Sequence, residues 1–217
     1  MIDVSIVMAL YDPDLARIRQ VIASCWQQGC KVELVIVNDG SVLGLNSRDE
    51  RIKVVDIKHH GMAAALNIGV HHAAGEFTVT LADDTLHVNA LLAMIDALMG
   101  SIDPPMTYAY GNIQLPDSLV RTPEWRPHRA GERLRTSGFF MWHRGQHLAC
   151  QFFQPPNLDF YAVDYDFILQ LEARGVRGVH AGVTTIDHAP GLNTQGIRDN
   201  RAAVDAEVLR RYKELNK

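Results

Sequence analysis

The stretch EFTVTLADD, residues 76–84, decides the fold class of this chain. Its first seven residues have the composition of a buried strand, and the apolar residues 86–99 that follow have helical spacing. Asp83 and Asp84 therefore stand at the carboxyl end of a strand, where two carboxylates repel one another and are costly to desolvate. A divalent cation such as Mg²⁺ or Mn²⁺ removes that cost, because hard cations prefer oxygen ligands. The alternative is that one Asp caps the following helix, for which a single Asp would suffice.

Strand and helix patterns alternate around this stretch, across residues 1–100. Such alternation predicts right-handed crossovers and an α/β fold with a mostly parallel sheet. The continuous apolar run at residues 4–9 is typical of a parallel strand buried on both faces. The predicted strands cover residues 4–9, 31–37, 53–57 and 76–82, and the predicted helices run from residue 12 to Gly29 and over residues 61–74.

Polar residues follow three of these strands at the point where each one ends. They are Tyr11 and Asp12 after the first strand, Asp39 with Gly40 and Ser41 after the second, and the acidic pair after the fourth. In parallel sheets, ligands bind beyond the carboxyl ends of the strands. We therefore expect a binding site at this edge of the sheet.

From residue 101 onward the sequence is broken by prolines and enriched in aromatic residues. It predicts strands at residues 107–114, 138–142 and 178–186, a short helix at 164–173 and an amphipathic helix at 199–215. No linker separates two domains, so we expect a single domain over residues 1–217. Its parts would be a ligand-binding half at 1–100, a second half at 101–192 and a C-terminal helix at 193–217.

The composition excludes several classes of protein. Hydrophobic residues make up 47% of the 217 residues and charged residues 21%, the balance of a globular protein with a substantial core. The net charge of -4 argues against general nucleic-acid binding. Three scattered cysteines form neither a disulfide framework nor a CxxC metal pattern. Without an apolar stretch of roughly 20 residues or a signal-peptide pattern, we expect a cytoplasmic protein, with peripheral contact at the inner face of the membrane left open.

Five segments in register resemble the family 2 glycosyltransferases, which have the GT-A fold. The segments are VSIVMALYD at residues 4–12, ELVIVNDGS at 33–41, GMAAALNIG at 61–69 with AGEF at 74–77, LADD at 81–84, and VDYDF at 163–167. The resemblance covers nearly the whole chain. It implies a Rossmann-like GT-A domain, with a mostly parallel central mixed sheet flanked by helices, and a metal-dependent inverting transfer of a sugar from a nucleotide-diphosphate donor, a UDP-sugar being favoured.

The resemblance also implies where the donor and the metal bind. Asp84, with Asp83 beside it, would hold Mn²⁺ or Mg²⁺, and one of the two acids would face the donor ribose. Asp39 would accept a hydrogen bond from the donor base, such as uracil; its alternative role is an Asx-turn. Tyr11 would stack on the base, and Asp12 would either bind the donor or cap the first helix.

Two further polar residues have competing interpretations. Asn67 lies inside a predicted helix, where it would contact the donor or bond to a neighbouring loop. His188 follows the last predicted strand, where the resemblance to GT-A enzymes implies a metal or diphosphate ligand; a neutral imidazole suits Mn²⁺, and the alternative is a loop histidine bonded to backbone. We interpret the pairs His59-His60 and His71-His72 as surface or helix-end residues, because neighbouring side chains on a helix diverge.

Asp164 matches the family's general base, which would take the proton of an acceptor hydroxyl. Asp166 would point about 200° away around the helix and cannot share that role directly. Both acids would also suit a helix N-terminus. Trp125, Trp142 and Tyr161 would line the acceptor pocket or simply pack.

The sequence leaves the acceptor open among glycan, lipid-linked and other hydroxyls, and leaves a homo-oligomer open. Polysaccharide biosynthesis is the commonest setting of the family. The alternative function is a non-catalytic GT-A domain that binds a sugar nucleotide or a partner.

Overall fold

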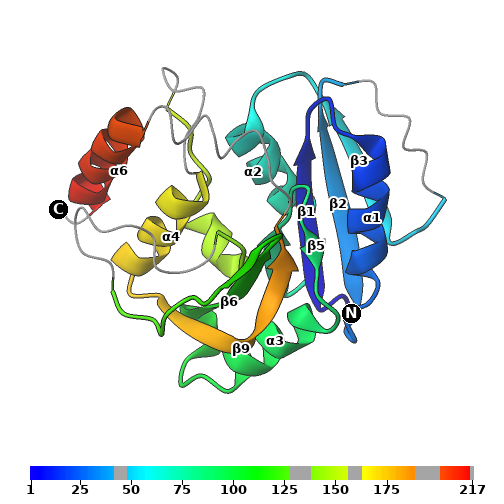
Figure 1. Cartoon of the computed structure of the whole chain (residues 1–217). Helices are drawn as coiled ribbons and strands as arrows, with labels where there is room; N and C mark the ends of the chain where they lie inside the picture. The colour runs from blue at the N-terminus through cyan, green and yellow to red at the C-terminus, as the bar shows by residue number, and fades with distance from the viewer. Residues whose placement is uncertain (42–47, 128–137, 156–162, 189–200, 216–217) are drawn as a thin grey trace.

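The computed structural model describes residues 1–41, 48–127, 138–155, 163–188 and 201–215 (Figure 1). Its strands are β1 (Val4–Leu10), β2 (Val32–Asp39), β3 (Ile52–Ile57), β4 (Phe77–Thr80), β5 (Thr85–Leu86), β6 (Thr107–Leu115), β7 (Ser118–Val120), β8 (Phe140–His143) and β9 (Arg177–Asp187). Its α-helices are α1 (Leu15–Cys25), α2 (Met62–His72), α3 (Ala90–Met99), α4 (Val163–Ala173) and α6 (Arg201–Leu215). Short 3₁₀ helices cover η1 (Pro104–Met106) and η2 (Arg144–Leu148).

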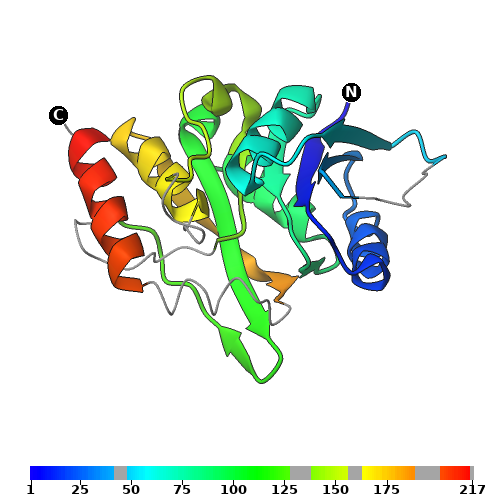
Figure 2. The same cartoon turned by 90° about the horizontal axis from the view of Figure 1, so that it is seen from above.

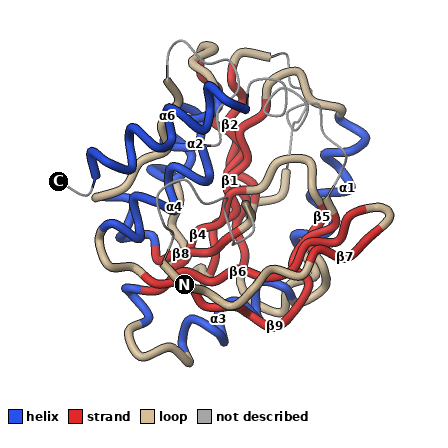
Figure 3. Tube along the Cα trace, turned by 60° about the vertical axis from the view of Figure 1, so that its left-hand side comes forward, coloured by secondary structure: helices blue, strands red, loops and turns tan. Residues whose placement is uncertain are grey.

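One sheet joins strands from both halves of the sequence, in the order β3-β2-β1-β4-β8-β6-β9-β5, with β7 paired to β6. The strands β3, β2, β1 and β4 are parallel, as the crossover pattern predicts, whereas β8 enters antiparallel between β4 and β6. β4 and β5 are separated by only residues 81–84, yet β5 lies at the far end of the sheet beside β9. The sheet is therefore curled, and the segment with the acidic pair bridges the curl (Figure 3).

Helices cover both faces of the sheet (Figure 1; Figure 2). On one face, α1 and α3 pack on the strands through a buried cluster that includes Ile18, Val21 and Met94. On the other face, α2, α4 and α6 share a second cluster that includes Phe167 and Val208. β2 is buried along its whole length, which agrees with the apolar run at its residues 34–37.

The predicted α/β class and mixed sheet are confirmed, and the differences are local. The apolar run at residues 86–99 is not one helix: Thr85–Leu86 forms β5 by pairing with β9, and the helix begins at Ala90 after Asn89, whose φ is 58°. Tertiary pairing overrides the local helical pattern there. β7, a three-residue strand paired with β6, was not among the predicted strands.

Two close contacts set the positions of β4 and α2, the elements that lead to the site. Gly75 donates its N–H to Oγ of Ser5, 2.8 Å away, and the Ser5 hydroxyl donates to the buried carboxylate of Glu33. This network sets where β4 starts beside β1. Gly69 packs on β1 so closely that a Cβ there would overlap Val7, and this approach seats α2 on the sheet. No helix among the described residues is long and apolar enough to cross a membrane.

Candidate functional site

The acidic pair lies at the carboxyl end of β4, as predicted. Leu81 donates its N–H to the carbonyl of Val7 at 2.9 Å, which holds the exit of β4 against β1. The guanidinium of Arg17, on α1, donates from Nε to the main-chain carbonyl of Asp83 at 2.7 Å. Asp83 and Asp84 are both partly buried. The segment is thus held on both sides, and neither carboxylate caps α3, because β5 intervenes.

Asp84 and His188 are in direct contact. Oδ1 of Asp84 lies 2.9 Å from Nδ1 of His188, and the two side chains are 14% and 34% exposed. His188 donates its main-chain N–H to the carbonyl of Gln114 at 2.7 Å, so its position is fixed by β6 as well. The hydrogen bond to Asp84, together with the charge of Asp83, raises the pKa of His188 despite its partial burial. The structure therefore brings together two of the three side chains predicted to bind metal.

The donor atoms of this pair fit Mn²⁺ or Mg²⁺, since a carboxylate oxygen suits either ion and a neutral imidazole suits Mn²⁺. Among the described residues, no group of three His, Cys, Asp or Glu side chains is arranged to hold a metal ion. Mg²⁺-type sites commonly take one or two protein carboxylates and complete their shell with water and substrate phosphates. The pair is thus a partial ligand set of that open kind.

Asp39 is almost completely buried at the end of β2, with 2% of its surface exposed. Its carboxylate accepts the main-chain N–H groups of His60, at 2.7 Å, and Gly61, at 2.9 Å, and lies 3.0 Å from Nδ1 of His59. It thereby fixes the chain that enters α2. The N–H of Ser41, which an Asx-turn of Asp39 would use, is donated instead to Oδ1 of Asn38 at 3.0 Å.

Tyr11 and Asp12 lie beside Asp39 in the described structure. The ring of Tyr11 is 61% exposed and its centroid is 4.3 Å from that of His59. Asp12 has a φ of 46° and donates its main-chain N–H to Oγ of Ser41 at 2.9 Å. The alternative that Asp12 caps α1 is wrong, because Asp14 is the N-cap.

Asn67 uses its amide on a neighbouring loop. Its Nδ2 donates to the carbonyl of Phe152 at 2.8 Å, and its Oδ1 accepts the N–H of the same residue at 2.9 Å. This is the second of the two roles considered for Asn67. A contact of Asn67 with a donor stays a prediction.

Asp164 lies in the first turn of α4, and its carboxylate faces Gly138. A Cβ on Gly138 would overlap Oδ2 of Asp164, so the absence of a side chain at residue 138 leaves room for the carboxylate. Burial raises the pKa of Asp164, although main-chain N–H groups of the same turn oppose the shift. β8 runs antiparallel to β4, with Val79 opposite Met141. Gly138, just before β8, therefore lies toward the carboxyl end of β4, the same edge as Asp83 and Asp84.

His59 is exposed, as predicted for a surface residue, but its place beside the candidate site was not predicted. It lies between the ring of Tyr11 and the carboxylate of Asp39. A signal was available, because His59 follows β3, and the end of β3 lies beside the end of β2 in a parallel sheet. His71 and His72 end α2, as predicted.

Two of the three aromatic residues considered for an acceptor pocket serve packing. Trp142 is fully buried in the cluster around α4. Trp125 donates from its indole to the carboxylate of Glu172 at 3.0 Å and packs against Gly178. Tyr161 lies outside the described residues. Trp142, with no exposed surface, cannot line an acceptor pocket, whereas a place for the partly buried Trp125 in such a pocket stays a prediction.

Comparisons with known proteins agree with this geometry. A model of glycosyl transferase family 2 matches residues 5–164. The structure resembles that of TarS 1–349 from S. aureus, with a TM-score of 0.62 and 16% identity over 99% of this chain and 71% of that one. A second S. aureus TarS structure gives a TM-score of 0.64 and 16% identity over 97% of this chain and 43% of the other. No curated protein matches the sequence.

The structural likeness establishes the fold, that of GT-A glycosyltransferases, with helices on both faces of a curled sheet. The family match spans β1 through the start of α4, so it includes the acidic pair and Asp164. The chain therefore belongs to glycosyl transferase family 2 and is a glycosyltransferase.

Proposed function

We propose that this glycosyltransferase is a metal-dependent inverting enzyme that uses a UDP-sugar and an acceptor hydroxyl, with Asp164 as the general base. The observation that carries the proposal is the position of Asp164 toward the sheet edge where Asp84 contacts His188. A single displacement needs a base for the acceptor hydroxyl and a group that stabilises the leaving diphosphate, and we assign these two roles to Asp164 and to the Asp84–His188 pair. The proposal deepens the family assignment, which by itself implies a nucleotide-sugar donor and an acceptor.

The donor base is proposed to bind at the ends of β1 and β2. The exposed ring of Tyr11 offers a stacking surface beside His59. Each carboxylate oxygen of Asp39 already accepts one main-chain N–H, and an ionised oxygen has a further lone pair. A base that presents an N–H, as uracil does, fits this acceptor, and this supports UDP as the nucleotide.

Asp84 and His188 are proposed to hold Mn²⁺ or Mg²⁺, with Asp83 adding negative charge beside them. When bound, the ion would neutralise charge that develops on the diphosphate leaving group. Binding requires a neutral imidazole. The proton that Asp84 stabilises on His188 must therefore leave before His188 can be a ligand.

Asp164 is proposed to accept the proton of the acceptor hydroxyl as its oxygen attacks the anomeric carbon. The bond to the diphosphate oxygen breaks on the opposite side, so the product has the inverted configuration. A raised pKa suits this step, because a stronger base accepts the proton more readily. The acceptor is proposed to be a hydroxyl of a glycan or a lipid-linked sugar, as in polysaccharide assembly.

The test is a calorimetric titration with UDP, in the presence of Mn²⁺ and then of a chelator. We expect UDP binding that depends on Mn²⁺ and is lost in Asp84→Ala. His188→Ala should weaken the dependence on Mn²⁺. His87→Ala is the matched control. His87, just after β5, forms a similar pair with Asp187, the last residue of β9, at 2.8 Å.

Other outcomes of the titration are informative. Equal UDP affinity with Mn²⁺ and with chelator would contradict the metal site. Tighter binding of GDP or dTDP than of UDP would contradict the choice of donor but leave the metal site standing. Loss of Mn²⁺ dependence in His87→Ala as well would show that the effect is not specific to the Asp84–His188 pair.

A further inference from the structure

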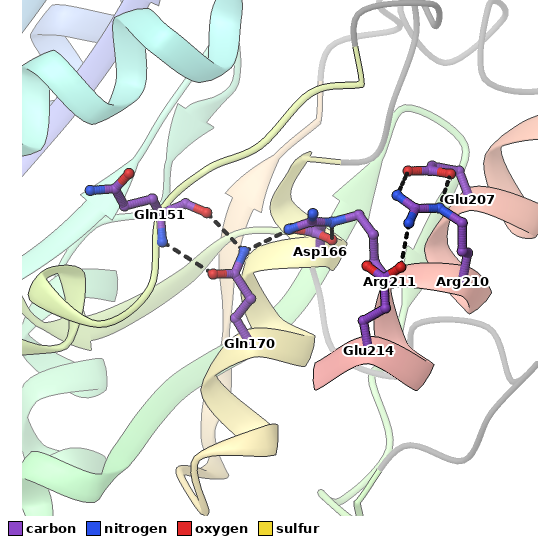
Figure 4. Close-up of polar contacts among 7 residues, drawn as sticks. All are labelled: Gln151, Asp166, Gln170, Glu207, Arg210, Arg211 and Glu214. Atoms are coloured by element: carbon purple, nitrogen blue, oxygen red, sulfur yellow. Dashed lines mark hydrogen bonds and ion pairs between the residues drawn. The ribbon is translucent and has the colours of Figure 1, made fainter. Parts of the chain in front are cut away.

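The C-terminal helix α6 is joined to α4 by a buried ion pair. Nε of Arg211 lies 2.6 Å from Oδ1 of Asp166, and Nη2 donates to Oδ2 at 3.1 Å (Figure 4). The Asp166 side chain is 1% exposed and that of Arg211 is 19% exposed. A bidentate contact of this kind fixes the orientation of both groups as well as their separation.

The same carboxylate is linked to the segment that precedes α4. Gln170, one turn along α4, donates from Nε2 to Oδ2 of Asp166 at 2.7 Å and to the carbonyl of Gln151 at 2.8 Å, and it accepts the N–H of Gln151 at 3.2 Å. The guanidinium of Arg211 lies 3.8 Å from the ring centroid of Phe153. Arg211 therefore contacts both α4 and the segment around Phe153.

This segment connects α4 to the donor side of the molecule. Phe152, between the two contacted residues, is held by both polar atoms of Asn67 on α2. The start of α2 is in turn held by the carboxylate of Asp39. A continuous set of contacts thus runs from α6 through α4 and the Gln151–Phe153 segment to α2.

The ion pair acts on the turn that carries the proposed base. Asp166 and Asp164 belong to the same first turn of α4, about 200° apart around the helix. Arg211 binds Asp166 on one side of this turn. On the other side Asp164 faces Gly138, where a Cβ would overlap Oδ2 of Asp164. A small rotation or shift of the turn would therefore move the Asp164 carboxylate relative to the sheet edge.

We infer that Arg211 is a positioning residue for Asp164. The helix α6 then helps to place the proposed base on the acceptor side, in addition to packing on the core. With or without a bound ligand, Arg211 holds the first turn of α4 because it contacts both Asp166 and the ring of Phe153. The inference rests on the proposed role of Asp164 as general base. Lys could supply the charge at this position but not the planar bidentate contact.

The neighbouring Arg210 offers a matched control. It pairs with Glu207 and Glu214, which lie three and four residues away on the same helix, and its side chain is 53% exposed (Figure 4). Arg210→Met therefore removes an arginine from α6 without touching the contact to α4. Arg211→Met removes that contact but leaves Asp166 buried without the cation, which destabilises proteins. The double variant Asp166→Asn/Arg211→Met removes both charges and avoids that penalty.

The first experiment is hydrogen–deuterium exchange of the intact chain, with peptides that cover residues 163–171 and the strands β1 and β2. We expect about tenfold faster exchange in residues 163–171 of Arg211→Met and of the double variant, with unchanged exchange in β1 and β2. Arg211→Lys should be intermediate, and Arg210→Met should match the wild type. Exchange in the double variant that matches Arg210→Met would overturn the inference.

The second experiment measures release of UDP from UDP-sugars by the same variants and by Asp164→Asn. For Arg211→Met we expect kcat to fall by about 10²-fold, the cost of a displaced catalytic group, with an unchanged KM for the donor and partial recovery in Arg211→Lys. An unchanged kcat in both Arg211→Met and the double variant, beside an inactive Asp164→Asn, would overturn the inference alone. An active Asp164→Asn would instead refute the proposed base, and the exchange result would still show whether Arg211 holds α4.

Discussion

Gly138 faces the carboxylate of Asp164 so closely that any side chain at residue 138 would overlap Oδ2. We expect Gly138→Ala to displace Asp164 and lower kcat by about 10²-fold, since small misplacements of a reacting group have effects of that size. UDP binding should persist, because the donor base is proposed to bind at the ends of β1 and β2. The measurement is steady-state kinetics beside a UDP titration. Gly100→Ala, at the end of α3 with a φ of -78°, is the control. Wild-type kcat in Gly138→Ala would refute the close fit.

The raised pKa of Asp164 makes a prediction about stability. Because burial raises the pKa of this carboxyl above its ordinary value of 3.8, the folded state holds the proton more tightly than the unfolded state. The contribution of Asp164 to stability is therefore most favourable below pH 3.8 and is lost as the pH rises through the folded-state pKa. Asn stays neutral throughout.

Asp164→Asn should consequently be more stable than the wild type at pH 7, and the difference should vanish in acid. Chemical unfolding at a series of pH values measures this. The wild-type kcat should also fall with acid at a pH above the ordinary Asp value. A variant that is less stable than the wild type at neutral pH would show that the Asp164 carboxylate is not desolvated in the folded state.

A substitution of Tyr11 can test donor binding with little effect on folding, because this residue is 61% exposed. We expect Tyr11→Ala to change the free energy of unfolding by no more than about 0.5 kcal/mol, as surface substitutions do. Loss of base stacking should weaken UDP binding by about 1–3 kcal/mol. Calorimetry and urea unfolding on the same protein give both values. Tyr11→Phe, which keeps the ring, should bind UDP like the wild type, and equal affinity of Tyr11→Ala would remove Tyr11 from the donor site.

The close packing of α2 on β1 depends on Gly69. A Cβ at this position would overlap Cγ1 of Val7 and press on Val37. We expect Gly69→Ala to destabilise the fold by about 1–3 kcal/mol, the usual cost of overpacking, even though Ala favours helix. Urea unfolding measures this. Because Val7→Ala also removes buried core volume, it serves as the reference: Gly69→Ala should cost less in the Val7→Ala background than in the wild type, and an equal cost would indicate that another contact is responsible.

Much of this architecture can be predicted from local sequence patterns. Parallel strands buried on both faces contain apolar runs, such as residues 34–37 of β2. The polar residues at the ends of β1, β2 and β4 follow from the same pattern, because parallel strands end at one edge. Asp39 and the Asp83–Asp84 pair were found in this way.

His188 was predicted as a metal ligand, but contacts that depend on distant pairing could not be derived from local sequence patterns. His188 meets Asp84 only because β5 pairs with β9, and a two-residue strand leaves no periodic signal. The contact of Arg211 with Asp166 depends on where α6 docks, which the helical pattern alone does not determine. Asp39 was predicted from its place in the chain, but its bonds to His60 and Gly61 come from the neighbouring crossover.

The place of β9 in the sheet has a consequence for synthesis on the ribosome. β9 lies between β6 and β5, and its Asp187 pairs with Thr85 of β5. A nascent chain that has emerged only as far as α4 has an open edge on β6 and an unpaired β5. Non-local pairing of this kind is slow and leaves strand edges exposed. The segment with Asp83 and Asp84 is thus made early, but it reaches its final position only when the last strand has been added.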